Sequence, residues 1–176
     1  MNAGTDEGLG PLLLGYDGSE GAQEAIASAG RVLAGREAIV VTVWESVGSA
    51  ILRHLPSGAT ELGRDARGIA EDVVKELDTA TAEGAEAVAA EGAALATTAG
   101  FLARPEARRA LARAAERDAV TVWRAILDAA EEEAAEVIVL GSRGRSPVTS
   151  MVLGSVSYGV VNNSERPVLI IPPGRD

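Results

Sequence analysis

The sequence contains no cysteine and only one histidine, His54, in 176 residues. The absence of cysteine excludes disulfide bonds, thiolate zinc sites and cysteine nucleophiles, and a lone histidine argues against a histidine metal cluster or a serine–histidine triad. No apolar run approaches the ~20 residues that a membrane helix needs. Aromatic residues make up 3% of the chain, so the core must consist of alanine, valine, leucine and isoleucine.

The formal net charge is −10, which argues against a nucleic-acid or anionic-membrane surface, because phosphate-rich partners are bound by basic faces. Residues 1–10 read as a loose tail, and their acidic, polar start is unlike a secretory signal peptide. A cytoplasmic location is expected by exclusion. With 47% apolar residues, the remaining chain, 11–173, is long enough to bury the core of one domain.

Short apolar runs alternate with segments of helical periodicity along the chain. Strands are predicted at 12–16, 39–44, 93–98, 137–140 and 167–172, and helices at 22–33, 62–91, 105–117, 123–134 and 156–163. The strand at 93–98 is assigned from its place in the alternation, since its alanines favour a helix. This order predicts an α/β domain in which helices cover both faces of an open, parallel five-stranded sheet.

A glycine motif follows the apolar run at 137–140. It consists of Gly141-Ser142-Arg143-Gly144 and, after nine further residues, Gly154-Ser155 at the start of the next helix. Glycines let a backbone turn sharply and approach a ligand closely. A helix that begins at Gly154 would direct free N–H groups and the positive end of its dipole at an anion. The motif therefore predicts a phosphate cradle without a P-loop lysine.

A second unusual strand end is Asp17-Gly18-Ser19, after the first strand. Ligands of open α/β sheets bind outside the carboxyl ends of the strands, where the strand order reverses. If the first and fourth strands are neighbours there, Asp17 could offer its carboxylate to a ribose hydroxyl or a base amine, and Val43 could support a flat base. Asp17 or Ser19 could also simply cap the following helix.

These segments resemble the universal stress protein family in its ATP-binding branch. The family signature G-x2-G-x9-G-S/T is present as Gly141, Gly144, Gly154 and Ser155, and the flanking residues 137–140 and 166–172 match as well. The front segments 14–19 and 41–45 resemble the family's first two strands. The resemblance covers most of the chain, and the carboxyl-terminal signature is its specific part.

The resemblance implies an adenine nucleotide alpha hydrolase-like, Rossmann-like fold with strand order 3-2-1-4-5. It also implies ATP, ADP or AMP as ligand, with Mg²⁺ or Mn²⁺ held by the phosphates, and a homodimer formed through the last strand, Val168 to Ile171. The expected nucleotide-binding residues are Gly15, Tyr16, Asp17, Val43, Gly141, Arg143, Gly144, Arg145, Gly154, Ser155, Val156 and Ser157.

One segment departs from the family pattern. About twenty additional residues, at about 101–120, separate the predicted third strand from the helix that contains Trp123, and they include five arginines. We interpret them as a helical insert that could cover the pocket or meet a protein partner. Covering the pocket is the less favoured of these two roles, because the third strand is expected at the edge of the sheet.

Three functions compete on this evidence. An ATP-binding regulatory or stress-response protein is favoured. A slow ATP hydrolase ranks lower, because the chain offers no Walker lysine and no general base beyond Asp17. A nucleotide-free dimeric scaffold is disfavoured by the intact glycine signature, and a nicotinamide-dependent oxidoreductase by the absence of G-x-G-x-x-G after either early strand.

Overall fold

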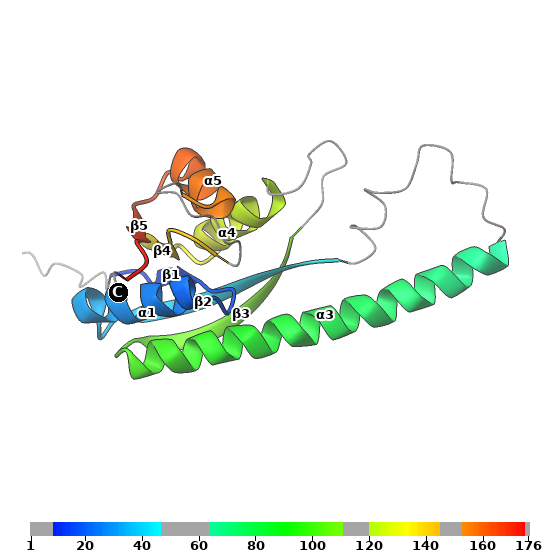
Figure 1. The fold of residues 1–176 in the computed structure, drawn as a ribbon, viewed down its shortest axis with the longest axis horizontal. Coiled ribbons are helices and arrows are strands. Elements are labelled where there is room, and N and C mark those ends of the chain that lie inside the picture. The colour runs from blue at the N-terminus through cyan, green and yellow to red at the C-terminus, as the bar shows by residue number, and fades with distance from the viewer. Residues whose placement is uncertain (1–8, 47–63, 111–119, 145–152, 175–176) are drawn as a thin grey trace, which may run out of the picture.

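The computed structural model describes residues 9–46, 64–110, 120–144 and 153–174. Within these residues, five parallel strands form one sheet in the order β3-β2-β1-β4-β5 (Figure 1). The strands are β1 (Leu12–Gly15), β2 (Glu37–Glu45), β3 (Leu102–Ala110), β4 (Val137–Gly141) and β5 (Val168–Ile171). The predicted α/β class and the strand order are therefore confirmed.

The helices lie on both faces of this sheet. The described helices are α1 (Glu20–Leu33), α3 (Arg64–Thr98), α4 (Val120–Glu132) and α5 (Ser155–Asn163). Helices α1 and α3 pack on one face, and α4 and α5 pack on the other (Figure 1). Within the described ranges, no helix is both long and apolar enough to cross a bilayer.

The central strands have apolar residues at consecutive buried positions because both of their faces are covered. Leu12 and Leu14 of β1 belong to the core under α1 and α3, whereas Leu13 between them belongs to the core under α4 and α5. Strand β2 alternates in the same way, with Val40 on the first face and Ile39 and Val41 on the second. Successive side chains of β1 and β2 therefore pack in the two helix layers on opposite faces of the sheet.

The third strand differs from the sequence prediction. Residues 93–98 are the last turns of α3, which runs through Gly92, so the strand predicted there is wrong. The chain turns at Gly100, whose φ of +96° suits glycine, and Phe101 N donates to Ala96 O to close the helix end. Strand β3 follows at once and pairs with β2 from Leu102 to Ala110.

The predicted helix over 105–117 is consequently wrong over residues 105–110, and the helical insert at about 101–120 is wrong over 102–110. Residues 111–119 lie outside the described ranges. Three of the five arginines, Arg104, Arg108 and Arg109, belong to β3. Strand β3 is an edge strand, as expected for the third strand of this order.

Candidate functional site

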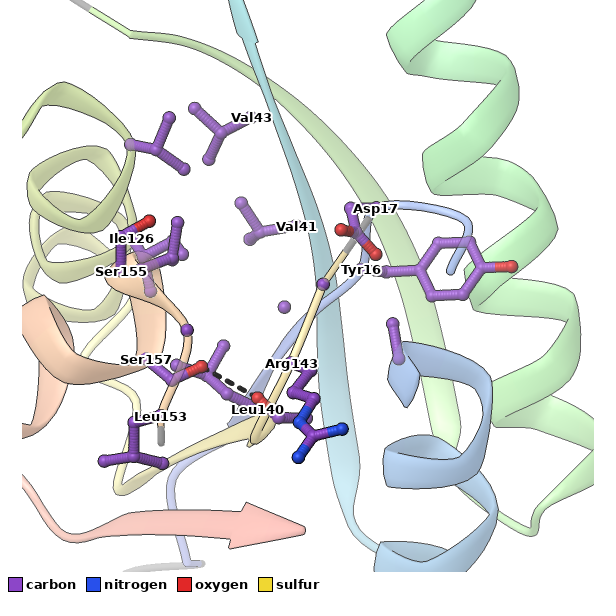
Figure 2. A pocket seen from close by; sticks show the side chains of 17 residues that line it. Tyr16, Asp17, Val41, Val43, Ile126, Leu140, Arg143, Leu153, Ser155 and Ser157 are labelled. Carbon is purple, nitrogen blue, oxygen red and sulfur yellow. Dashed lines mark hydrogen bonds between the residues drawn. The ribbon is translucent and has the colours of Figure 1, made fainter. Parts of the chain in front are cut away.

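The carboxyl ends of β1 and β4 lie side by side, because the two strands pair in parallel from Leu12↔Val137 to Leu14↔Val139. The loops that follow them border a cavity of about 460 Å³ (Figure 2). Ligand cavities of this kind usually measure about 300–1,000 Å³. The adjacency on which the sequence argument depended is thus present, and both unusual strand ends open onto one cavity.

The two carboxylate oxygens of Asp17 have different surroundings. Oδ1 accepts hydrogen bonds from the backbone N–H of Ser19, at 3.0 Å, and from the Ser19 hydroxyl, at 2.5 Å. Oδ2 faces Gly144, where an added Cβ atom would lie 2.7 Å from it. Ser19 is the residue that caps α1, through the Ala22 N–H, so Asp17 supports the cap through Oδ1. Oδ2 lies beside Gly144, and both residues line the cavity.

Two glycines of the motif, Gly141 and Gly144, are required by close contacts with the first turn of α1 and with Asp17. A Cβ atom on Gly141 would lie 2.7 Å from the carbonyl oxygen of Gly21, in the first turn of α1, and one on Gly21 would lie 2.9 Å from Arg143 O. The described glycines with positive φ are Gly18, Gly35 and Gly100. Gly141 and Gly144 therefore serve close approach of the backbone and not a left-handed conformation, whereas a Cβ atom at Gly154 would meet only ordinary contacts.

Helix α5 begins at the cavity, with Gly154 as its N-cap residue. Gly154 N donates to Ser142 O at 2.8 Å, and the buried Ser157 hydroxyl donates to Gly141 O at 2.8 Å (Figure 2). These bonds attach the first turn of α5 to the end of β4. The N–H groups of Ser155 and Val156 have no acceptor inside the helix, so the positive end of its dipole faces the cavity.

An apolar wall completes the cavity. Val41 and Val43 extend from one face of β2 (Figure 2). Val122 and Ile126 lie one helical turn apart on α4 and also line the cavity. Only Val43 was predicted from the sequence. Val41 could have been found from the two-residue period of β2, and Ile126 from the apolar face of the predicted helix. Ala22, Leu140 and Leu153 also line the cavity without having been predicted.

Tyr16 lines the cavity, but its ring points away from it. Figure 2 shows the ring pointing toward α3, on the side opposite the apolar wall. The Tyr16 hydroxyl donates to Glu91 Oε1 at 2.7 Å, and the side chain is buried. Burial, followed by this hydrogen bond, raises the pKa of Tyr16 to about 12.

Eleven of the twelve predicted residues border the cavity, and Arg145 lies outside the described residues. Their roles are unequal. The Ser157 hydroxyl is engaged within the fold, whereas Ser155 is exposed at the start of α5. Arg143 is half-buried in the loop after β4. Whether these residues bind a nucleotide remains a prediction.

Comparison with known proteins agrees with this geometry. The model of the universal stress protein family matches residues 9–172. Universal stress protein MJ0577 of Methanocaldococcus jannaschii is 37% identical over 46 residues, which span 26% of this chain and 28% of that protein. The chain thus aligns in sequence with just over a quarter of this relative's length.

Solved structures share the fold over nearly the whole chain. The structure of MJ0577 has a TM-score of 0.69 at 20% identity, and the alignment covers 95% of this chain and 98% of that one. A universal stress protein in complex with cAMP has a TM-score of 0.54 at 22% identity, and the alignment covers 94% of this chain and 98% of that one. The universal stress protein from Archaeoglobus fulgidus in complex with dAMP has a TM-score of 0.51 at 20% identity, and the alignment covers 93% of this chain and 98% of that one.

The strand order and the fold shared with solved structures agree with the match to the family model. That model extends from the start of β1 to the end of β5 and leaves only the two chain ends unmatched. The protein therefore belongs to the universal stress protein family.

Proposed function

We propose that this protein binds an adenine nucleotide, with ATP as the expected ligand, in the cavity between β1 and β4. One observation carries the proposal: the start of α5, the Asp17 carboxylate and the apolar wall of β2 and α4 all border the same cavity. A nucleotide needs these three environments at once, because it combines anionic phosphates, a hydroxylated sugar and a flat apolar base.

The phosphates would lie at the start of α5, against the N–H groups of Ser155 and Val156 and the loop containing Gly144. The base would lie against Val43 and Ile126, with the ribose near Asp17. Similarity to proteins whose structures contain cAMP and dAMP supports an adenine nucleotide. The proposed Mg²⁺ or Mn²⁺ would be held by the phosphates, and the described residues include no group of three or more metal-ligating side chains.

We further propose that the protein is a regulatory homodimer that pairs through β5. The two edges of the sheet differ in their suitability for pairing. Strand β3 has Arg104, Pro105 and Arg108, and charges and proline discourage edge pairing. Strand β5 consists of four half-buried apolar residues, so it is the edge that favours a second copy.

The test of nucleotide binding is calorimetric titration of the purified protein with Mg²⁺-ATP, compared with Gly154→Val. A Cβ atom at Gly154 would have only ordinary contacts, the nearest at 3.5 Å from Ser142 O, and its φ of −60° is open to any residue. The fold should therefore survive while the valine occupies the space of the phosphates. We expect affinity to fall at least about tenfold.

Gly84→Val is the matched control, because a Cβ atom at Gly84 on α3 would meet nothing within 4 Å. Its affinity for ATP should equal that of the unmodified chain. Equal affinity in a folded Gly154→Val protein would contradict the assignment of the phosphate site. Failure of the unmodified chain to bind ATP, ADP or AMP would contradict the proposed function itself.

A further inference from the structure

The asymmetry of the Asp17 carboxylate has a consequence for the class of nucleotide bound. A carboxylate oxygen has two lone pairs, and Oδ1 already accepts two hydrogen bonds, both from Ser19. A ribose held by its two neighbouring hydroxyls, one on each carboxylate oxygen, would need Oδ1 as well. The Ser19 Oγ atom also accepts from the Ala22 N–H as the cap of α1, so the start of that helix fixes the hydroxyl beside Oδ1.

The other oxygen is accessible only in part. Oδ2 accepts no hydrogen bond from the described residues, but Gly144 covers one side of it, since an added Cβ atom would lie 2.7 Å away. Asp17 and Gly144 both line the cavity, and Figure 2 shows the Asp17 side chain at its border. The geometry therefore leaves one direction from which a hydroxyl can donate to Asp17.

We infer that the site recognises the sugar through a single hydroxyl and accepts either the 2′- or the 3′-hydroxyl. This inference rests on the proposed nucleotide site and specifies its ligands. Adenine nucleotides that lack one hydroxyl should bind about as well as ATP, and nucleotides that lack both should bind more weakly. Ser19 is the positioning residue for this selectivity, because it occupies Oδ1 and thereby withholds the second acceptor.

The experiment compares Mg²⁺-bound ATP, 2′-deoxy-ATP, 3′-deoxy-ATP and 2′,3′-dideoxy-ATP by calorimetry on the full chain. Either monodeoxy nucleotide should bind within about threefold of ATP, because one hydroxyl still meets Oδ2. The dideoxy nucleotide should bind about 10- to 100-fold more weakly, because the carboxylate then loses its partner. In Asp17→Ala, whose side chain can neither donate nor accept a hydrogen bond, this difference between ATP and dideoxy-ATP should largely disappear.

Ser19→Ala tests the positioning role. Removing the hydroxyl frees one lone pair on Oδ1, so ATP should gain a second bond and exceed 2′-deoxy-ATP by about threefold to tenfold. Ser19→Thr keeps a hydroxyl and should retain the original ratio. Ser28→Ala is the control, because Ser28 lies on α1 and bonds only Arg31 among the described residues. A ratio of two affinities within one variant is insensitive to partial loss of folded protein.

The outcomes separate the two proposals. If ATP binds more than about tenfold better than both monodeoxy nucleotides, each hydroxyl has its own acceptor and the inference is wrong. If dideoxy-ATP binds as well as ATP, Asp17 does not contact the sugar, and the inference fails although nucleotide binding stands. An unchanged ratio in Ser19→Ala would overturn the role of Ser19. Only the absence of binding by every nucleotide would indicate that the proposed function has failed.

Discussion

Gly92, in the interior of α3, lies directly against the ring of Tyr16. A Cβ atom added to Gly92 would be 2.6 Å from Tyr16 Cδ1 and 2.8 Å from Val40 Cγ1, closer than such atoms can approach. Tyr16 and Val40 are buried in the core under α1 and α3 and have no free space into which to move. Glycine is therefore what lets α3 pack closely on the sheet beside the candidate site.

Gly92→Ala should consequently destabilise the protein, although alanine is the better helix former. Forcing a methyl group into a packed core costs about 1–3 kcal/mol. Gly84→Ala provides the contrast, since an added Cβ atom there would meet nothing within 4 Å. It should raise the free energy of unfolding by up to about 1 kcal/mol, in line with helix propensity. Urea denaturation of both variants measures the difference, and equal effects would contradict the packing role of Gly92.

The same contact explains where sequence reasoning failed. The helix predicted over 62–91 ends just before Gly92, whereas α3 continues through Gly92, whose role is to allow close packing on the sheet. The alanines at 93–98 follow their intrinsic preference for helix. The sequence of β3, which contains Arg104, Pro105 and Arg108, is typical of a charged helix. It becomes a strand because nine residues pair with β2, and this long-range contact is invisible to local periodicity.

The candidate site was more predictable because its parts are local. Asp17 follows a run of three leucines, and Gly141 follows Val137–Leu140, so each strand end is visible in the sequence. Their adjacency came from the family resemblance, and the pairing of β1 with β4 confirms it. The different surroundings of the two Asp17 oxygens depend on contacts with Ser19 and Gly144, which no sequence pattern encodes.

The raised pKa of Tyr16 predicts a loss of stability in alkali. The ordinary value is 10.0 and the value in the folded protein is about 12, because the buried hydroxyl donates to Glu91. Between these values the unfolded chain releases the proton while the folded chain retains it, so the free energy of unfolding falls as the pH rises. The contribution is fully present below pH 10 and is lost by about pH 12.

Denaturation at a series of alkaline pH values measures this effect, and Tyr16→Phe is the control because it cannot ionise. The stability of the phenylalanine variant should decline less steeply over this interval. Near-ultraviolet absorbance of tyrosinate should also lose its late transition in that variant. Parallel pH profiles for the two proteins would contradict the assignment.

Arg108 should contribute more to stability than Arg104, although both are arginines on β3. Arg108 donates to Glu106 at 2.9 Å and to Glu132 at 2.6 Å, and its side chain is only 18% exposed. Glu106 Oε2 is buried with no hydrogen-bond partner among the described residues, and its ion pair with Arg104 is long, at 3.8 Å, so Arg108 is the main partner of the carboxylate. Arg108→Ala should cost about 1–3 kcal/mol, because it leaves Glu106 without a hydrogen bond from the described residues.

Arg104 is 52% exposed and pairs with Glu133 on the surface, so Arg104→Ala should cost less than about 1 kcal/mol. Adding Glu106→Gln to Arg108→Ala should recover part of the loss, because the buried charge disappears. Thermal denaturation of the three variants provides the comparison. Equal destabilisation by the two arginine substitutions would mean that burial of Glu106 has no energetic role.

Pairing of two copies through β5 requires the outward backbone groups of that strand. Ile138 N donates to Pro167 O and Ser142 N donates to Ile171 O, so the carbonyls of 167 and 171 face β4. Backbone groups alternate in direction along a strand, which places the N–H of Ile170 on the open edge. Ile170→Pro removes this donor and leaves the pairing with β4 intact.

We therefore expect Ile170→Pro to be a folded monomer under conditions in which the unmodified chain is a dimer, as measured by sedimentation velocity. Ile170→Ala is the control for the lost side chain: it keeps the N–H and should remain dimeric, at some cost in stability because Ile170 packs under α5. A dimer that persists in Ile170→Pro would locate the interface elsewhere. A monomeric unmodified chain would contradict the proposed assembly, and nucleotide binding could still hold, because every cavity residue described comes from one chain.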